Sequence, residues 1–245
     1  MPRKLLNLAI ENREKGAGLR AEATGEDTTT VYVYDVIDGW WGVSAADFAR
    51  ELAAITTPNA VLRINSPGGD VFEARAMMAA IAEHPAKFTA RIDGLCASAA
   101  TALTLCCDSV EIVDGGFYMI HQAWTFAMGN ADELRTTASL LDKVDTVLVN
   151  GYVEKTGKPE AEVRALMAAE TWLDAEEAVE AKFCDAKVEL TTGGKDKAAQ
   201  ARAFNLSAFA NAPKALTAKP EELQIDEAAR ERMLARLGLY ERTAG

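Results

Sequence analysis

The chain has 245 residues, of which 49% are hydrophobic, and its 37 acidic and 26 basic side chains give a formal net charge of −11. A chain of this length and composition can bury a sizeable core, so intrinsic disorder over most of it is excluded. The negative charge argues against nucleic acid as a ligand, because proteins bind phosphate backbones mainly through lysine and arginine.

The sequence offers no segment for a membrane. No uninterrupted apolar run approaches the roughly 18 to 20 residues of a membrane-spanning helix. Residues 1–16 surround a short apolar patch with charged side chains, unlike an export signal. We therefore expect a cytoplasmic protein that does not bind membranes.

The cysteines do not form a metal-binding pattern. They lie mostly among apolar residues, without Cys-x-x-Cys spacing, and only two histidines are available to join them. We expect reduced thiols, mostly buried, and no metal site. The four positions are Cys96, Cys106, Cys107 and Cys184.

Strand and helix patterns alternate from residue 30 onward. Residues 1–29 are polar and have no lasting period, so we expect an N-terminal arm. Ser44 is placed to cap the first helix. Strands that alternate with helices predict the α/β class, with a parallel sheet covered by helices. The patterns lie at 31–37 and 44–55, 60–65 and 70–84, 87–94 and 97–107, then at 109–113 and 116–121.

The longest predicted helix comes next. Its pattern covers about 131–156 and ends at Gly157, and a shorter helix follows at about 159–169. Asp174 and Glu177 have the spacing of a capping box at the start of another helix. Because a linker-like composition begins near residue 190, we expect a compact domain at 30–190 and a flexible or docked tail at 191–245.

The turn INSPGGD at 64–70, between a strand and a helix pattern, is the first candidate site. Gly68 and Gly69 can leave amide groups uncovered near the positive end of the helix dipole, where they could bind an oxyanion. A tight connection without function fits the turn equally well. Nucleotide binding has less support, because G-x-x-x-x-G-K-[ST] is absent and this turn does not match G-x-G-x-x-G.

The second candidate is GLCASAA at 94–100, again between a strand and a helix pattern. Ser98 is flanked by alanines, so a substrate and a base can approach its hydroxyl group. A serine at such a place is also a common helix cap. Cys96 is an alternative nucleophile, but apolar surroundings raise the pKa of a thiol and lower its reactivity.

The third candidate is His121, at the end of the strand pattern FYMIH. Open α/β sheets present functional groups at strand ends, and imidazole transfers protons near neutral pH, although a structural role also fits. His84 lies at a helix end, which favours a capping role. A triad would also need a carboxylate to orient the imidazole, and spacing does not choose among Glu170, Asp174 and Asp185.

Together these segments resemble the proteolytic subunit of the Clp protease, ClpP. The resemblance covers residues 31–185 in five ordered motifs. A closer resemblance, in the last motif and in the tail AFNLSAFANAP, is to the ClpP-related prohead proteases of phage head maturation. The motifs are INSPGG at 64–69, G-x-x-A-S-A-A at 94–100, MIHQ at 119–122, G-N-A-D-x-L at 129–134, and ETWLDAEEAV at 170–179 with F-x-D at 183–185.

The resemblance implies a ClpP/crotonase-type spiral of β-β-α units, with a long protruding helix at about 131–156 that mediates contacts in homo-oligomeric rings. It implies that Ser98 is the nucleophile and His121 the general base, and that the amides of Gly69 and Ala99 form an oxyanion hole. It carries the third triad position to Glu170, where ClpP has the shorter Asp. We then expect activity to fall below about pH 6 to 7, because His121 must be neutral to accept a proton.

The resemblance also implies substrate binding by Gly68, Gln122, Ala123 and Trp124, although ClpP usually has proline after its His-Gln pair. Neither a metal nor another cofactor is required for this chemistry. The implied function is a serine endopeptidase that processes capsid or scaffold proteins, and its own tail, in the host cytoplasm or an assembling prohead. Portal or capsid proteins are the implied partners.

Two other functions stay open at this point. Crotonase-like acyl-CoA enzymes share the implied fold and oxyanion hole, but they do not generally pair a serine with a histidine at these positions. A ring-forming capsid assembly or scaffold protein without catalysis fits if Glu170 does not complete the triad.

Overall fold

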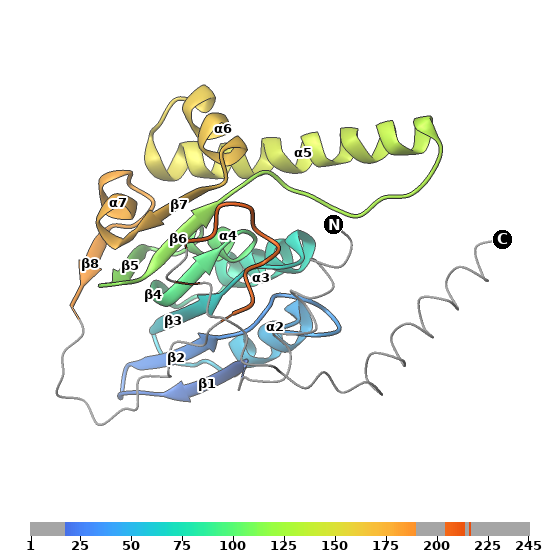
Figure 1. Ribbon diagram of the computed structural model, residues 1–245. Coiled ribbons are helices and arrows are strands. Elements are labelled where there is room, and N and C mark those ends of the chain that lie inside the picture. Colours follow the sequence, from blue (N-terminus) through green and yellow to red (C-terminus); the bar gives the residue numbers. More distant parts are fainter. Residues whose placement is uncertain (1–17, 190–203, 214–215, 217–245) are drawn as a thin grey trace, which may run out of the picture.

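The computed structural model describes residues 18–189, 204–213 and 216 (Figure 1). The strands form one eight-stranded mixed sheet in the order β1-β2-β3-β4-β5-β8, and β6 pairs with both β4 and β7. The strands are β1 (Leu19–Ala23), β2 (Thr28–Val33), β3 (Asn59–Ser66), β4 (Lys87–Ala97), β5 (Ser109–Val113), β6 (Phe117–Ile120), β7 (Thr171–Asp174) and β8 (Ala186–Val188). The helices are α2 (Ala45–Ala53), α3 (Val71–Glu83), α4 (Ala100–Thr104), α5 (Ala131–Thr156), α6 (Glu160–Ala168) and α7 (Ala175–Glu180).

Side-chain alternation along the central strands builds the core. In β3, Leu62 and Ile64 are fully buried, whereas Arg63 between them is partly exposed. Helices α2 and α3 bury Phe48 and Met77 in the same cluster. The predicted α/β class is therefore confirmed, and the central strands β2, β3, β4 and β5 are parallel to one another.

The sheet is not parallel throughout, which differs from the prediction. Strand β1 pairs antiparallel with β2, and β7 pairs antiparallel with β6. Strand β1 lies inside the expected arm at 1–29, so this part of the segment belongs to the sheet. Its side chains are half-buried or exposed because β1 is an edge strand, and this leaves little hydrophobic alternation in the sequence. Residues 1–17 of the expected arm lie outside the described residues.

Helix α5 has the predicted bounds and is 26 residues long. A capping box between Asn130 and Glu133 starts it, and Gly157, in the left-handed conformation with φ 68°, ends it. Leu148 and Tyr152 are buried near its carboxyl end, whereas Leu134 is 44% exposed. The amino-terminal half of α5 accordingly projects beyond the sheet (Figure 1).

Two local predictions hold at the other helix starts. The Ser44 side chain accepts a hydrogen bond from the Asp47 amide at the start of α2. Asp174 and Glu177 form the predicted capping box at the start of α7. Both devices satisfy amide groups that have no partner inside the helix.

Part of the tail is docked on the domain. Phe204, Leu206 and Phe209 are 2–6% exposed and pack against Leu95 and Met119 of the sheet. They form a second apolar cluster, separate from the main core. The rest of the predicted tail, 191–203, 214–215 and 217–245, lies outside the described residues.

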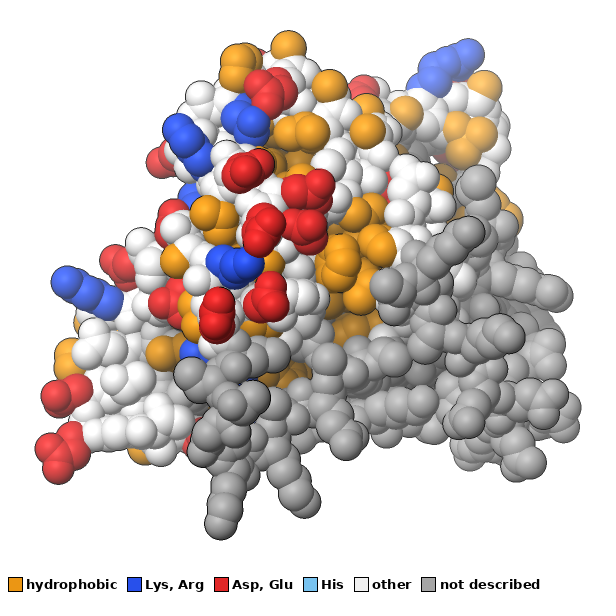
Figure 2. Space-filling view, turned by 60° about the vertical axis from the view of Figure 1, so that its left-hand side comes forward, with side chains coloured by type: hydrophobic (Ala, Val, Ile, Leu, Met, Phe, Trp, Pro, Cys, Tyr) orange, Lys and Arg blue, Asp and Glu red, His pale blue; other side chains and the backbone are white. Residues whose placement is uncertain are grey.

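Charged side chains are spread over the surface. Figure 2 shows acidic side chains outnumbering basic ones on one face, in keeping with the negative net charge. Within the described residues, no helix combines the length and apolar character that a membrane span needs.

Candidate active site

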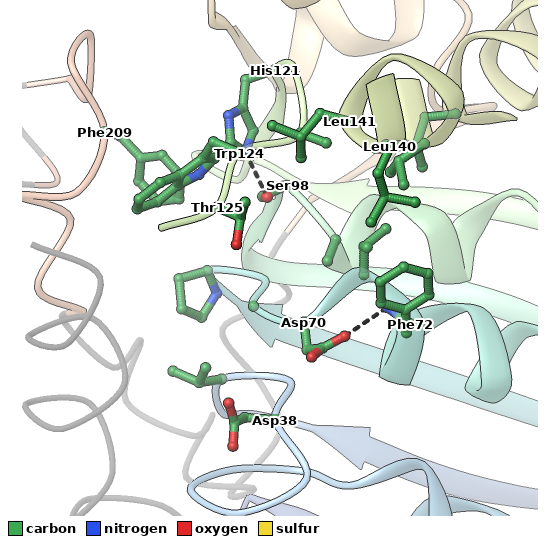
Figure 3. A pocket seen from close by; sticks show the side chains of 18 of the residues that line it. Asp38, Asp70, Phe72, Ser98, His121, Trp124, Thr125, Leu140, Leu141 and Phe209 are labelled. Atoms are coloured by element: carbon green, nitrogen blue, oxygen red, sulfur yellow. Dashed lines mark hydrogen bonds between the residues drawn. The ribbon is translucent and has the colours of Figure 1, made fainter. Parts of the chain in front are cut away.

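Ser98 and His121 are joined by a hydrogen bond of 2.6 Å between Ser98 Oγ and His121 Nε2 (Figure 3). Ser98 follows the last residue of β4, and His121 follows the last residue of β6. These strands are parallel neighbours, so their carboxyl ends lie at the same edge of the sheet. The fold therefore brings together a hydroxyl group and an imidazole that are far apart in the sequence.

The backbone at Ser98 is held in an unusual conformation. Its φ is 55°, in the left-handed region that non-glycine residues rarely adopt. The Ser98 amide donates to the Met119 carbonyl, and the Ser98 carbonyl accepts from the Thr101 hydroxyl at 2.6 Å. Thr101 in turn contacts the Tyr152 hydroxyl of α5. These bonds maintain a sharp strand-to-helix turn that presents the serine, as in nucleophile elbows.

The glycine turn lies directly against the Ser98 turn. A Cβ atom on Gly68 would lie 2.5 Å from the Ala97 carbonyl oxygen and 2.8 Å from the Ala99 nitrogen, so only glycine fits. Ile37 pairs with this turn by donating to the Gly68 carbonyl and accepting from the Asp70 amide.

That pairing leaves the Gly69 amide directed away from Ile37. Among the described residues, neither the Gly69 amide nor the Ala99 amide donates to an acceptor, and the two turns are adjacent. Both amides are thus available to an oxyanion near Ser98, as an oxyanion hole requires.

Burial controls the basicity of His121. The loss of hydration lowers the pKa of His121 to about 4, and the negative charge of Glu170 offsets part of this effect. The imidazole is consequently neutral at neutral pH and can accept a proton from Ser98. From the sequence we expected His121 to become protonated near the ordinary histidine pKa of about 6.5. In the structure, His121 becomes protonated only at a lower pH.

Strand pairing explains why Glu170 lies near His121. Strands β6 and β7 are antiparallel with Ile120 opposite Thr171, so His121 and Glu170 lie next to the same end of this pair, and the charge of Glu170 acts on the imidazole. The Glu170 backbone is left-handed, with φ 49°. No hydrogen bond joins the two side chains in the described structure, and the Glu170 carboxylate accepts from other groups instead.

Those other donors are the Trp172 indole and the tail. Glu170 Oε1 accepts from the Asn211 amide at 2.6 Å and from Trp172 Nε1 at 3.2 Å. Glu170 Oε2 accepts from the Ala210 amide at 2.9 Å. The structure thus brings the predicted third triad residue beside His121 without completing the triad.

A cleft of about 420 Å³ runs past Ser98 and His121. Leu140, Leu141 and Val144 of α5 line it, and Figure 3 shows Leu140 and Leu141 on the helix side of Ser98. Mostly apolar side chains surround Ser98 and His121, a setting suited to an extended polypeptide with an apolar side chain.

The predicted substrate-binding residues differ in position. Ala123 and Trp124 line the cleft, and Trp124 is 37% exposed. Gly68 lies beneath the Ser98 turn, and Gln122 is exposed, with its amide bonded to the Met167 carbonyl. Neither Gly68 nor Gln122 lines the cleft.

Two site residues were missed from the sequence. Asp145, buried in α5, accepts a hydrogen bond from the Ala123 amide at 2.6 Å and so fixes the segment after His121. The only sign of this role in the sequence is that Asp145 is an acidic residue next to the apolar stripe of α5. Phe209 of the tail lines the cleft, and no local pattern announces such a contact.

The alternative site residues have other roles. Burial raises the pKa of Cys96 well above its ordinary value, so its thiol is a poor nucleophile. His84 caps the end of α3, and its Nδ1 atom accepts a hydrogen bond from the Ala86 amide, so its role is local and structural. Asp185 forms an ion pair with Lys155 and accepts a hydrogen bond from the Val110 amide, and neither partner belongs to the Ser98 site. Within the described part of the chain, no group of three or more His, Cys, Asp or Glu residues could hold a metal ion.

We predict that Gly68→Ala destabilises the protein by about 2 to 4 kcal/mol, because it adds a clash with the Ser98 turn to left-handed strain at φ 85°. Gly115→Ala is the matched control, since Gly115 has φ 80° and open space around it. Urea unfolding of the two variants measures the difference. Equal losses of unfolding free energy would contradict the contact.

Comparisons with known proteins agree with this architecture. The family model described as Clp protease matches residues 45–189. The ATP-dependent Clp protease proteolytic subunit 1 of Protochlamydia amoebophila is 29% identical over 167 residues, which is 65% of this chain and 80% of that protein. The structure of a ClpP1 mutant from Listeria monocytogenes aligns with a TM-score of 0.58 and 20% identity, covering 66% of this chain and 91% of the other.

The structural match establishes the ClpP-type α/β fold. The family match favours the Clp protease over the crotonase-like alternative, and it includes the segments that carry Ser98, His121 and Glu170. The chain belongs to the Clp protease family.

Proposed function

We propose that the chain is a serine endopeptidase in which Ser98 is the nucleophile and His121 the general base. The observation that carries this proposal is the 2.6 Å contact between Ser98 Oγ and His121 Nε2 at the edge of an apolar cleft. Membership of the Clp protease family supports it. The name of the Protochlamydia amoebophila relative, a proteolytic subunit, agrees with the same activity.

The proposed reaction uses only side chains and amides of the protein. Ser98 Oγ attacks a peptide carbonyl while His121 Nε2 takes its proton, and the amides of Gly69 and Ala99 bind the resulting oxyanion. His121 then gives the proton to the leaving amine, and an acyl-enzyme remains on Ser98. Water activated by His121 releases the acyl group and restores Ser98.

Glu170 is proposed as the third member of the triad. A carboxylate hydrogen-bonded to Nδ1 holds the imidazole in the correct tautomer and stabilises its charged form during the reaction. Glu170 precedes β7 and His121 follows β6 at the same end of this strand pair, and the charge of Glu170 acts on the imidazole. Its side chain is one methylene longer than the Asp of ClpP.

We further propose that the substrates are capsid or scaffold proteins processed in an assembling prohead. The resemblance of residues 170–179 and 203–213 to phage head maturation proteases supports this assignment. Homo-oligomeric rings are proposed through α5, because Leu134, Leu140 and Val147 are apolar and 44–50% exposed on this projecting helix. Portal or capsid proteins would be the neighbouring partners.

A ring-forming assembly protein without catalysis is the second candidate. The observation in its favour is that the Glu170 carboxylate bonds to Trp172 and the tail rather than to His121. An activated serine distinguishes the two functions.

We predict that a fluorophosphonate forms one covalent adduct on the wild-type chain, located on Ser98, because His121 activates this hydroxyl group. Intact-mass spectrometry and peptide mapping measure it. Ser98→Ala should give no adduct, whereas Ser139→Ala, at a serine of α5 outside the cleft, should react as the wild type does. A folded wild-type protein without an adduct after prolonged incubation would favour the assembly protein.

The pH dependence of this labelling follows from the lowered pKa of His121. Protonation removes the acceptor for the Ser98 proton, so the rate should stay level from pH 8 to about pH 5 and fall about tenfold per pH unit below about pH 4. Circular dichroism at each pH checks that the protein is folded. A fall centred at pH 6 to 7 would show that His121 titrates as an exposed histidine.

A further inference from the structure

The docked segment 204–211, called the tail segment below, contacts both His121 and Glu170. It is anchored by Phe204, Leu206 and Phe209, which are buried against β4 and β6 in the second apolar cluster. The cluster has its own hydrophobic anchors and lies outside the main core, so the tail segment can leave without opening that core.

Phe209 is the contact between the tail segment and the catalytic base. Its ring lies 5.5 Å from the His121 ring, at 83°, and 5.7 Å from the Trp172 ring, at 77°. Both arrangements are edge-to-face, the preferred geometry for aromatic pairs. Figure 3 shows Phe209 beside His121 and Trp124 at one end of the cleft.

Glu170 is the contact between the tail segment and the third triad position. Its two oxygens accept the consecutive amides of Ala210 and Asn211, at 2.9 and 2.6 Å. The Asn211 side chain adds a bond to the Ala169 carbonyl, which fixes the tail segment to the same turn. Hydrogen bonds to a carboxylate are stronger than those between neutral groups.

These bonds direct the Glu170 carboxylate toward the tail. Ser98 Oγ is the one hydrogen-bonding partner that the described structure gives to the His121 side chain, so its Nδ1 atom lacks the carboxylate of a working triad. A turn of the carboxylate toward His121 would therefore compete with its bonds to the two tail amides.

We propose that the tail segment is an autoinhibitory latch that holds Glu170 away from His121 until the segment is released. The proposal rests on the proposed function and adds its regulation. Release would leave Glu170 beside His121 with Trp172 Nε1 as its remaining donor, and would open the end of the cleft that Phe209 fills. Loss of the orienting carboxylate lowers the rate of a serine protease by up to about 10⁴-fold, so the latched form is a slow enzyme.

The test compares labelling rates of Ser98 by a fluorophosphonate in full-length variants. Leu206→Asp places a charge in the second apolar cluster, away from the catalytic residues, and should release the tail segment. We expect labelling about 10- to 100-fold faster than in the wild type. Ser207→Asp adds the same charge at the neighbouring exposed position and should leave the rate unchanged.

Two further variants identify the mechanism. Phe209→Ala removes the ring contact without adding charge and should also accelerate labelling. Adding Glu170→Gln to Leu206→Asp should abolish the gain, because the freed side chain no longer carries a negative charge for His121. A gain that survives Glu170→Gln would overturn the latch.

Hydrogen exchange gives a readout that does not depend on catalysis. The amides of Ala210 and Asn211 should exchange slowly in the wild type and rapidly in Leu206→Asp. Rapid exchange of these amides in Leu206→Asp with no labelling of Ser98 in any variant would reject the proposed peptidase. Labelling at equal or lower rates in both release variants, or loss of the folded domain in both, would overturn the latch and make the tail segment a structural part of the domain.

Discussion

The parallel pairing of β4 with β6 is the constraint on which the site depends. The Met119 carbonyl accepts a hydrogen bond from the Ser98 amide. This bond fixes the Ser98 turn to β6, the strand that His121 follows. The short contact between the two side chains follows from this pairing and from the left-handed backbone at Ser98. Gly68, which follows β3, packs against the same turn. The ends of β3, β4 and β6 together therefore fix the position of Ser98 relative to His121.

The third triad position depends on a different pairing. Antiparallel strands β6 and β7 bring Glu170 near His121, but the backbone register does not decide where a flexible carboxylate points. That direction is set by whichever donors are present, and here they include the amides of Ala210 and Asn211. The rigid sheet thus fixes Ser98 and His121, whereas the direction of the Glu170 side chain depends on the donors around it.

Local signals account for what the sequence could predict. The Ser44 cap, the Asp174 capping box and the end of α5 at Gly157 each involve residues close together in the chain. Strand ends and the family resemblance indicated Ser98 and His121. The edge strand β1 was missed because its side chains are only half-buried, and the docking of Phe209 was missed because contacts between distant segments leave no period in the sequence.

The proposed latch would act on the basicity of His121 through both burial and charge. A general base works best when its pKa lies near the working pH, and burial has moved the pKa of His121 down to about 4, which weakens it as a base. Phe209 contributes to that burial through its ring contact, while the tail amides hold the carboxylate that would raise the pKa further by a hydrogen bond. In the proposed latch, one docked segment would therefore lower the reactivity of His121 in two ways, without displacing it from Ser98.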